Sequence, residues 1–383
     1  MPSRPPSGQH PKIRVKRHPS RAENDPLLLR RVLNNPCSAR EFSLNDWDLL
    51  VQQGYCSSLL ARVKAQLDDQ TVSIPSRVNI HLTSAQIRAT AHSDDVRIEI
   101  EAIIKALKPA GITPVFLKGA AYVLAGDSAS SGRLFSDVDI FIPKTQLGAA
   151  EQFLKWQGWQ PEQLDAYDEH YYREWMHEIP ALIHQQRGTA LDVHHNLLPL
   201  IGRIKIDASL LQQTVTAGQL TLPAEDRLIH SATHLFCSGE FESGFRDLSD
   251  LNLMIREFGQ EKDFWDKLLK RTAQLGVGRL LYYALRYCDH HFSSPIPDGA
   301  LRQIGRYAPN PLTLKLMDWM FDRALIPHHS SCNKPFSSLG RILLLIRSHW
   351  LKMPLITLIP HLFRKAVINP IMHREDTIEQ LKG

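Results

Sequence analysis

The hydrophobic positions of the 383-residue chain change their spacing twice along its length. Between residues 25 and 108, apolar side chains recur every three or four positions, as at Ile100 and Ile104, which is typical of amphipathic helices. Between residues 109 and 222, short apolar runs alternate with Gly and Pro, and from 223 to 383 the helical spacing returns. The pattern predicts a helical N-terminal region, a central core with strands, and a helical C-terminal domain.

The central core is predicted to hold short buried strands between helices. In chain order we expect a strand at 115–117, a helix at 120–125, a strand at 138–142, a helix at 145–157, and extended runs at 179–185 and 190–194. Strands that follow one another directly and strands separated by helices both occur in this order. The fold class is therefore predicted to be α+β, with a small mixed sheet flanked by helices.

Composition narrows the class of protein. Apolar residues make up 43% and charged residues 22%, which excludes a wholly disordered chain, a coiled coil and a polytopic membrane protein. The net charge is +5, but it is unevenly placed: residues 1–24 carry +5, residues 337–383 carry +4, and the stretch between them carries −4. Because residues 1–24 are also rich in Pro, we expect them to form a disordered basic tail.

The cysteines indicate a reducing compartment. The five cysteines are scattered and include no CxxC pair, so we expect neither a disulfide framework nor a cysteine-based zinc site. We also see no apolar run typical of a signal peptide or a membrane span, and the expected location is cytoplasmic.

Candidate chemistry centres on three acids. Asp137 and Asp139 are two positions apart at the start of the strand at 138–142, so their side chains should project to the same side. Asp192 lies in the run at 190–194, and it completes a cluster of carboxylates if the two strands are neighbours. Adjacent carboxylates repel each other unless a cation lies between them. Oxygen ligands of this kind suit Mg²⁺ or Mn²⁺.

A second feature suits phosphate binding. Lys118 and Gly119 follow the strand at 115–117 and begin a helix, so they offer backbone N–H groups and room for close approach. Lys118 and Arg133 also supply positive charge for phosphate oxygens.

These motifs, taken in order, resemble the uncharacterised nucleotidyltransferase family of the DNA polymerase β superfamily. The segments that carry the resemblance are Phe116–Ala121, Arg133, Ser136–Ile140, Leu191–His194, Ala224–His230 with His234, Arg246–Leu248 with Asp250-Leu251, and Arg347–Leu351. The last of them is similar to the tail of members from exopolysaccharide gene neighbourhoods. One departure stands out: the superfamily usually has Gly-Ser after the first strand, and this chain has Lys118-Gly119-Ala120 without a hydroxyl.

The resemblance implies a nucleotidyltransferase-type sheet and transfer of a nucleoside monophosphate from an NTP to a hydroxyl acceptor. Asp137 and Asp139 would hold two metal ions, and Asp192 would bind the catalytic metal and help to deprotonate the acceptor. The implied nucleotide and phosphate ligands are Lys118, Gly119, Arg133 and Ser136.

The acceptor stays open. A small hydroxylated or saccharide acceptor agrees with the exopolysaccharide association, whereas a toxin-like transferase would modify tRNA, with the basic ends contacting RNA. A third alternative is an inactive nucleotide-binding or scaffold protein.

Three histidines and one apolar segment complete the candidates. His194 shares a strand face with Asp192, and His230 and His234 are one helical turn apart, so each is a candidate for the cleft. Residues 342–363 combine apolar side chains with flanking Arg and Lys. This segment is predicted either to pack on the C-terminal domain or to lie on an anionic membrane surface, at its inner face.

Overall fold

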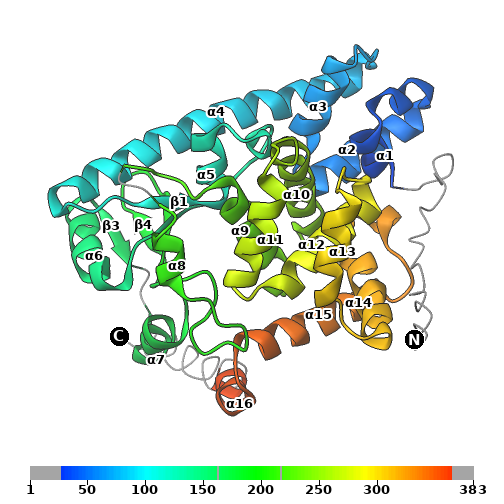
Figure 1. The fold of residues 1–383 in the computed structure, drawn as a ribbon. Helices are drawn as coiled ribbons and strands as arrows, with labels where there is room; N and C mark the ends of the chain where they lie inside the picture. Colours follow the sequence, from blue (N-terminus) through cyan, green and yellow to red (C-terminus); the bar gives the residue numbers. More distant parts are fainter. Residues whose placement is uncertain (1–26, 162–163, 216–217, 365–383) are drawn as a thin grey trace, which may run out of the picture.

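The computed structural model describes residues 27–161, 164–215 and 218–364, so the predicted disordered tail at 1–24 lies outside the described residues. The N-terminal region is helical, as predicted, and comprises α1 (Leu28–Asn34), α2 (Leu44–Cys56), α3 (Leu60–Asp69) and α4 (Ser76–Leu107). Figure 1 shows α4 as a single long helix that runs along one edge of the molecule and reaches both the sheet and the helical domain. At 1.5 Å per residue, it spans roughly 48 Å.

A five-stranded mixed sheet forms the centre of the core, which confirms the predicted fold class. Its strands in spatial order are β1 (Val115–Leu117), β2 (Asp137–Phe141), β5 (Ala190–His194), β4 (Leu182–His184) and β3 (Trp159–Pro161). The pairing of β2 with β5 is parallel, and the other neighbours are antiparallel. The edge strand β3 was not predicted, because it has three residues and ends in a proline, a residue that sheets accept at their edges.

The two faces of β2 have different environments. Val138 and Ile140 pack with Ile100 and Ile103 of α4 in one hydrophobic cluster. Because side chains alternate along a strand, Asp137 and Asp139 project to the opposite face, as predicted from their spacing. Helices α5 (Lys118–Ala125) and α6 (Leu147–Trp156) complete the layer around the sheet, and the short helices α7 (Ala166–His170) and α8 (Ala208–Gln212) lie in the connections that follow.

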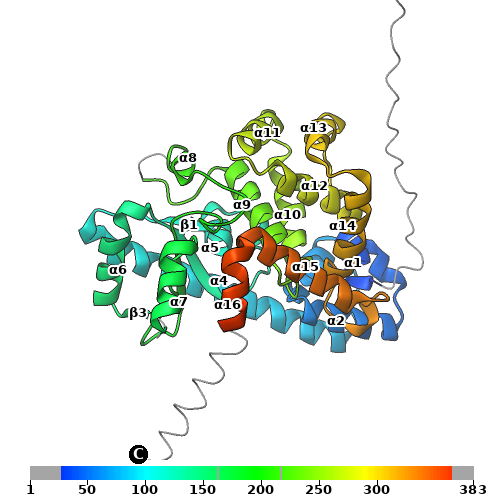
Figure 2. The ribbon, with the colours of Figure 1, turned by 90° about the horizontal axis from the view of Figure 1, so that it is seen from below.

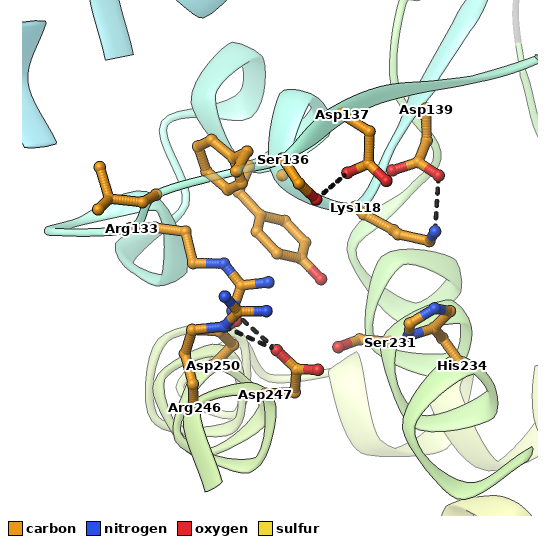
Figure 3. Close-up of a pocket in the computed structure, with 14 residues that line it drawn as sticks. Lys118, Arg133, Ser136, Asp137, Asp139, Ser231, His234, Arg246, Asp247 and Asp250 are labelled. Carbon is orange, nitrogen blue, oxygen red and sulfur yellow. Dashed lines mark hydrogen bonds and ion pairs between the residues drawn. The ribbon is translucent and has the colours of Figure 1, made fainter. Parts of the chain in front are cut away.

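The rest of the described chain is helical, as predicted. It consists of α9 (Ala224–Cys237), α10 (Gly244–Phe258), α11 (Phe264–Gln274), α12 (Gly278–Phe292), α13 (Asp298–Ile304), α14 (Pro311–Ala324), α15 (Ser337–Lys352) and α16 (Leu355–Phe363). One hydrophobic cluster joins these helices to the N-terminal ones, with members such as Leu29 and Leu50 together with Leu248 and Phe321. Helices α9 and α10 face the sheet across the site described below (Figure 3).

The last two helices expose an unusual amount of apolar surface. Leu344 of α15 is fully buried, but Ile346 is 58% exposed, and Ile356 and Ile359 of α16 are 83% and 66% exposed. Figure 2 shows α15 and α16 side by side at the surface, with α16 next to α7. Among the described residues, no helix combines the length and the apolar character needed to cross a bilayer.

Candidate active site

The sheet register brings two of the predicted acids together. Asp139 of β2 pairs directly with Asp192 of β5, and in a parallel pair opposed residues share a face. A ligand atom from each of Asp139, Asp192 and His194 lies within 4.8 Å of the other two. Asp137, two residues earlier on β2, lies outside this group and lines the neighbouring cavity. The acids are thus arranged as one close pair, Asp139 and the half-buried Asp192, with Asp137 beside Asp139 on the cavity wall.

The cavity has a volume of about 130 Å³ and lies between the sheet and helices α9 and α10 (Figure 3). Its walls contain three basic and four acidic side chains. The lining residues are Lys118, Gly119, Tyr122, Arg133, Leu134, Phe135, Ser136, Asp137, Asp139, Ser231, His234, Arg246, Asp247 and Asp250. All four residues predicted to bind nucleotide or phosphate are therefore on this wall.

Lys118 is held in an unusual backbone conformation at the start of α5. Its φ angle is +44°, in the left-handed region that non-glycine residues rarely adopt. From there its Nζ donates to Oδ1 of Asp139 at 2.6 Å. Burial alone would lower the pKa of Lys118, but the Asp139 carboxylate outweighs it and raises the pKa above its usual range. Lys118 therefore carries a positive charge against Asp139.

Asp139 is almost fully buried yet ionised. Burial would raise its pKa, but the charge of Lys118 and a hydrogen bond from His194 hold the pKa well below its usual range. Both contacts use the same oxygen, since Nε2 of His194 lies 2.9 Å from Oδ1. The second oxygen, Oδ2, takes part in neither contact.

The pKa of Asp192 is shifted in the opposite direction to that of Asp139. Burial, followed by the negative charges of Asp139, Glu178 and Asp137, raises its pKa to about 7. A carboxylate that keeps its proton near neutral pH beside other carboxylates has too little positive charge around it. A divalent cation bound by Asp139 and Asp192 would supply that charge, and the oxygen donors suit Mg²⁺ or Mn²⁺. The residues present therefore fit the metal that the carboxylate pattern predicts.

Gly119 is required by packing. A Cβ atom on this residue would lie 1.9 Å from a ring carbon of Phe135, far inside van der Waals contact. The backbone amide of Phe135 in turn donates to Nε2 of His92 on α4 at 2.9 Å. Phe135 directly precedes Ser136, whose hydroxyl donates to Asp137 at 3.0 Å. Gly119 thus lets the segment that leads into β2 lie close to the start of α5.

Arg133 is fixed by two acids of α10. Its guanidinium donates to Asp247 at 2.9 Å and also contacts Asp250, which forms a buried ion pair with Arg62 of α3 at 2.8 Å. Arg62 additionally donates to the carbonyl oxygen of Ala129 at 2.9 Å. Burial would raise the pKa of Asp247, but Arg133 and Arg246 hold it below its usual range. These contacts tie the loop before β2 to the helical domain.

The three candidate histidines occupy different places. His234 lines the cavity, and its side chain is exposed there. His230 and His194 are both buried, with exposed fractions of 4% and 2%, and neither of them lines the cavity. Among the described residues, neither His230 nor His234 belongs to a group with metal-ligand spacing.

Several residues near the acids were not predicted from the sequence. Tyr122, Phe135 and Ser231 line the cavity, and Glu178 forms an isolated bridge with His194. Tyr122 and Ser231 lie within apolar helices, where nothing in the pattern separates a cavity residue from a core residue. Glu178 directly follows His177, just before the extended run at 179–185. This pair of metal-ligand residue types was the only sequence feature that could have indicated a role for Glu178.

The fold and the site define an α+β protein in which paired carboxylates on adjacent parallel strands adjoin a cavity rich in charge. A family model described as uncharacterised nucleotidyltransferase matches residues 43–293, about two thirds of the chain. The chain therefore belongs to the uncharacterised nucleotidyltransferase family, which confirms the resemblance seen in its motifs. Comparisons with curated proteins and with solved structures gave no match.

Proposed function

We propose that the protein is a metal-dependent nucleotidyltransferase that moves a nucleoside monophosphate from an NTP to a hydroxyl acceptor. The observation that carries the proposal is the register of β2 and β5, which sets Asp139 beside Asp192 with Asp137 on the adjoining cavity wall. In the reaction, the acceptor oxygen forms a bond to the α-phosphorus while the bond from the α-phosphorus to the bridging oxygen breaks. Pyrophosphate leaves, and the proton of the acceptor hydroxyl must be taken up.

The three carboxylates have distinct proposed roles. Asp139 and Asp192 hold the cation pair together with Asp137, and bound divalent cations would neutralise charge on the attacking and leaving oxygens. A carboxylate oxygen of Asp192 would receive the acceptor proton, since the pKa of Asp192 is raised to about 7 by its burial and by the neighbouring carboxylates. Lys118 keeps Asp139 ionised and pointed toward the cavity through its 2.6 Å contact.

The charge of the cavity wall argues that nucleotide and cation bind together. Lys118, Arg133 and Arg246 face four carboxylates, and each of the three bases already contacts at least one of them. The wall therefore has no spare positive charge for a triphosphate. Nucleotide binding at this site should depend on divalent cations that accompany the phosphates.

For the acceptor, we propose a small hydroxylated or saccharide molecule, in line with the exopolysaccharide association that the sequence resemblance suggests. A tRNA acceptor and an inactive nucleotide-binding scaffold are the alternatives that the assay below distinguishes.

The assay is pyrophosphate release by the full chain with Mg²⁺ or Mn²⁺, each of four NTPs, and panels of saccharides and tRNA. Asp137→Ala combined with Asp139→Ala should abolish release, whereas Asp94→Asn, a control at an exposed acid of α4, should retain it. Undiminished transfer by the double variant would refute the metal assignment. A tRNA acceptor would give transfer that falls steeply with salt. Nucleotide binding without transfer to any acceptor would favour the scaffold.

We also propose that α15 and α16 contact an anionic membrane surface at its inner face. Ten of the nineteen exposed large apolar side chains in the described residues lie between Phe336 and Leu362, a concentration that indicates a binding surface. Basic side chains accompany them: Arg203 is exposed and stacks on Trp350 at 4.3 Å, and Lys352 ends α15. An amphipathic apolar face bordered by Arg and Lys suits anionic lipid headgroups.

A further inference from the structure

A second group of metal-type ligands adjoins Asp139, and the proposed transfer reaction does not use it. An isolated bridge pairs Glu178 with His194, the last residue of β5, and His177 directly precedes Glu178. One ligand atom from each of these three residues lies within 4.8 Å of the other two. The backbone holds them in place, because the amide of His195 donates to the carbonyl oxygen of His177 at 2.8 Å. Strand pairing, rather than a free loop, therefore brings the three together.

His194 faces a carboxylate oxygen at each of its ring nitrogens. Nε2 lies 2.9 Å from Oδ1 of Asp139, and Nδ1 lies 3.3 Å from Oε2 of Glu178. A neutral imidazole has a single N–H group. If Nε2 donates to Asp139, the lone pair of Nδ1 faces the negative oxygen of Glu178. That contact is repulsive unless a proton or a metal ion lies between the two atoms.

The spacing of the ligand atoms suits a metal ion. Oε2 of Glu178 lies 3.7 Å from Nε2 of His177 and 3.3 Å from Nδ1 of His194. Bonds of about 2.0–2.2 Å at tetrahedral angles separate neighbouring ligand atoms by about 3.3–3.6 Å. Two imidazoles and one carboxylate form a donor set that zinc takes in proteins.

We propose that His177, Glu178 and His194 bind a divalent cation of the zinc class, separate from the cations held by the aspartates. Asp139 would then accept a hydrogen bond from the ring nitrogen of a metal-bound histidine, the arrangement that commonly orients such a ligand. The ion joins the segment before β4 to the end of β5. Through His194 it also fixes the orientation of Asp139.

A rival group exists and serves as a control. His290, His291 and Asp322 have similar spacing, but Lys334 already supplies a positive charge to Asp322. His290 is also half exposed, whereas His194 is almost fully buried. We therefore expect the rival group to bind a metal ion more weakly.

The test is titration of the chelator-treated full chain with Co²⁺ in the presence of excess Mg²⁺ and without nucleotide. We expect one equivalent to give the visible absorption of a tetrahedral nitrogen and oxygen site, and Zn²⁺ to displace it. Glu178→Gln and His177→Asn should each weaken Co²⁺ binding by about 100-fold or more. His290→Asn and the exposed control His81→Asn should leave it unchanged.

The outcomes separate this site from the proposed transferase centre. Asp137→Asn should impair transfer but keep the tetrahedral Co²⁺ spectrum. Absence of that spectrum in the unmodified chain would overturn the proposal, because it would leave a proton between His194 and Glu178 instead of a metal ion. Full binding in both Glu178→Gln and His177→Asn, or loss in His290→Asn, would overturn it as well.

Discussion

The contact between Lys118 and Asp139 shows how one residue can set the state of the site. Asp139 is 2% exposed, and a buried carboxylate without a partner would be protonated. Lys118 reaches it from the start of α5, where its backbone has a positive φ angle. The start of α5 therefore places a fixed cation beside Asp139.

Asp192 gives a pH-dependent prediction for the metal-free protein. Its pKa is raised to about 7 from an ordinary value of 3.8, so between these values the folded state keeps a proton that the unfolded state releases. The free energy of unfolding therefore falls as pH rises through this window, by at most about 4 kcal/mol. Asp192→Asn should raise the melting temperature at pH ~8 by several degrees and have less effect at pH ~5.

Calorimetry of the metal-free variant and parent at both pH values measures this effect, with Asp94→Asn as the control. A melting temperature for Asp192→Asn equal to or below that of the parent at pH ~8 would show that Asp192 bears no electrostatic penalty.

At the scale of elements, the sequence predicted the strands that carry the acids but not how they meet. Apolar composition identified β2 and β5, and period-two alternation placed Asp137 and Asp139 on one face. The parallel pairing that sets Asp139 beside Asp192 joins strands that are far apart in the sequence. From the sequence it could therefore be stated only that the acids cluster if the two strands are neighbours. Glu178 reaches the site through an isolated bridge, which leaves no periodic signal in a sequence.

The packing of α5 against the segment before β2 gives a second prediction. Gly119→Ala places a methyl group against the ring of Phe135, so it should destabilise the fold by about 1–3 kcal/mol. Phe135→Leu should relieve the clash. The loss in free energy of unfolding in the double variant should therefore be smaller than the sum of the losses in the two single variants. Urea unfolding of the four proteins measures the coupling. Strictly additive effects would contradict this account of Gly119.

At the scale of the whole molecule, the site depends on parts that are distant in sequence. Arg62 from the N-terminal helices, Arg133 from the loop before β2, and Asp250 from α10 form one buried ion-pair network. The hydrophobic cluster that joins the N-terminal and C-terminal helices supports it. Helical periodicity predicted those helices, but it carries no information on which helices pack together, so Arg62 could not be assigned to the site.

The exposed face of α15 and α16 gives a prediction for the molecule as a whole. The full chain should float with vesicles of phosphatidylcholine and phosphatidylglycerol, and much less with phosphatidylcholine alone. Ile356→Asp with Ile359→Asp should abolish flotation, whereas Ile80→Asp with Ile87→Asp, at exposed sites on α4, should not. Equal flotation of the two double variants would contradict membrane contact by this face. A dimer of the parent that only the α16 variant disrupts would identify the face as a contact between copies.

The most direct test of the central claim is equilibrium binding of each NTP to the full chain with and without Mn²⁺, since it needs no acceptor. Because the cavity wall has three bases against four carboxylates, we expect at least one NTP to bind about tenfold or more tightly with Mn²⁺. Asp139→Asn should remove that gain, and Asp94→Asn should keep it. Nucleotide binding that is equally tight without Mn²⁺, or a gain that persists in Asp139→Asn, would contradict the account.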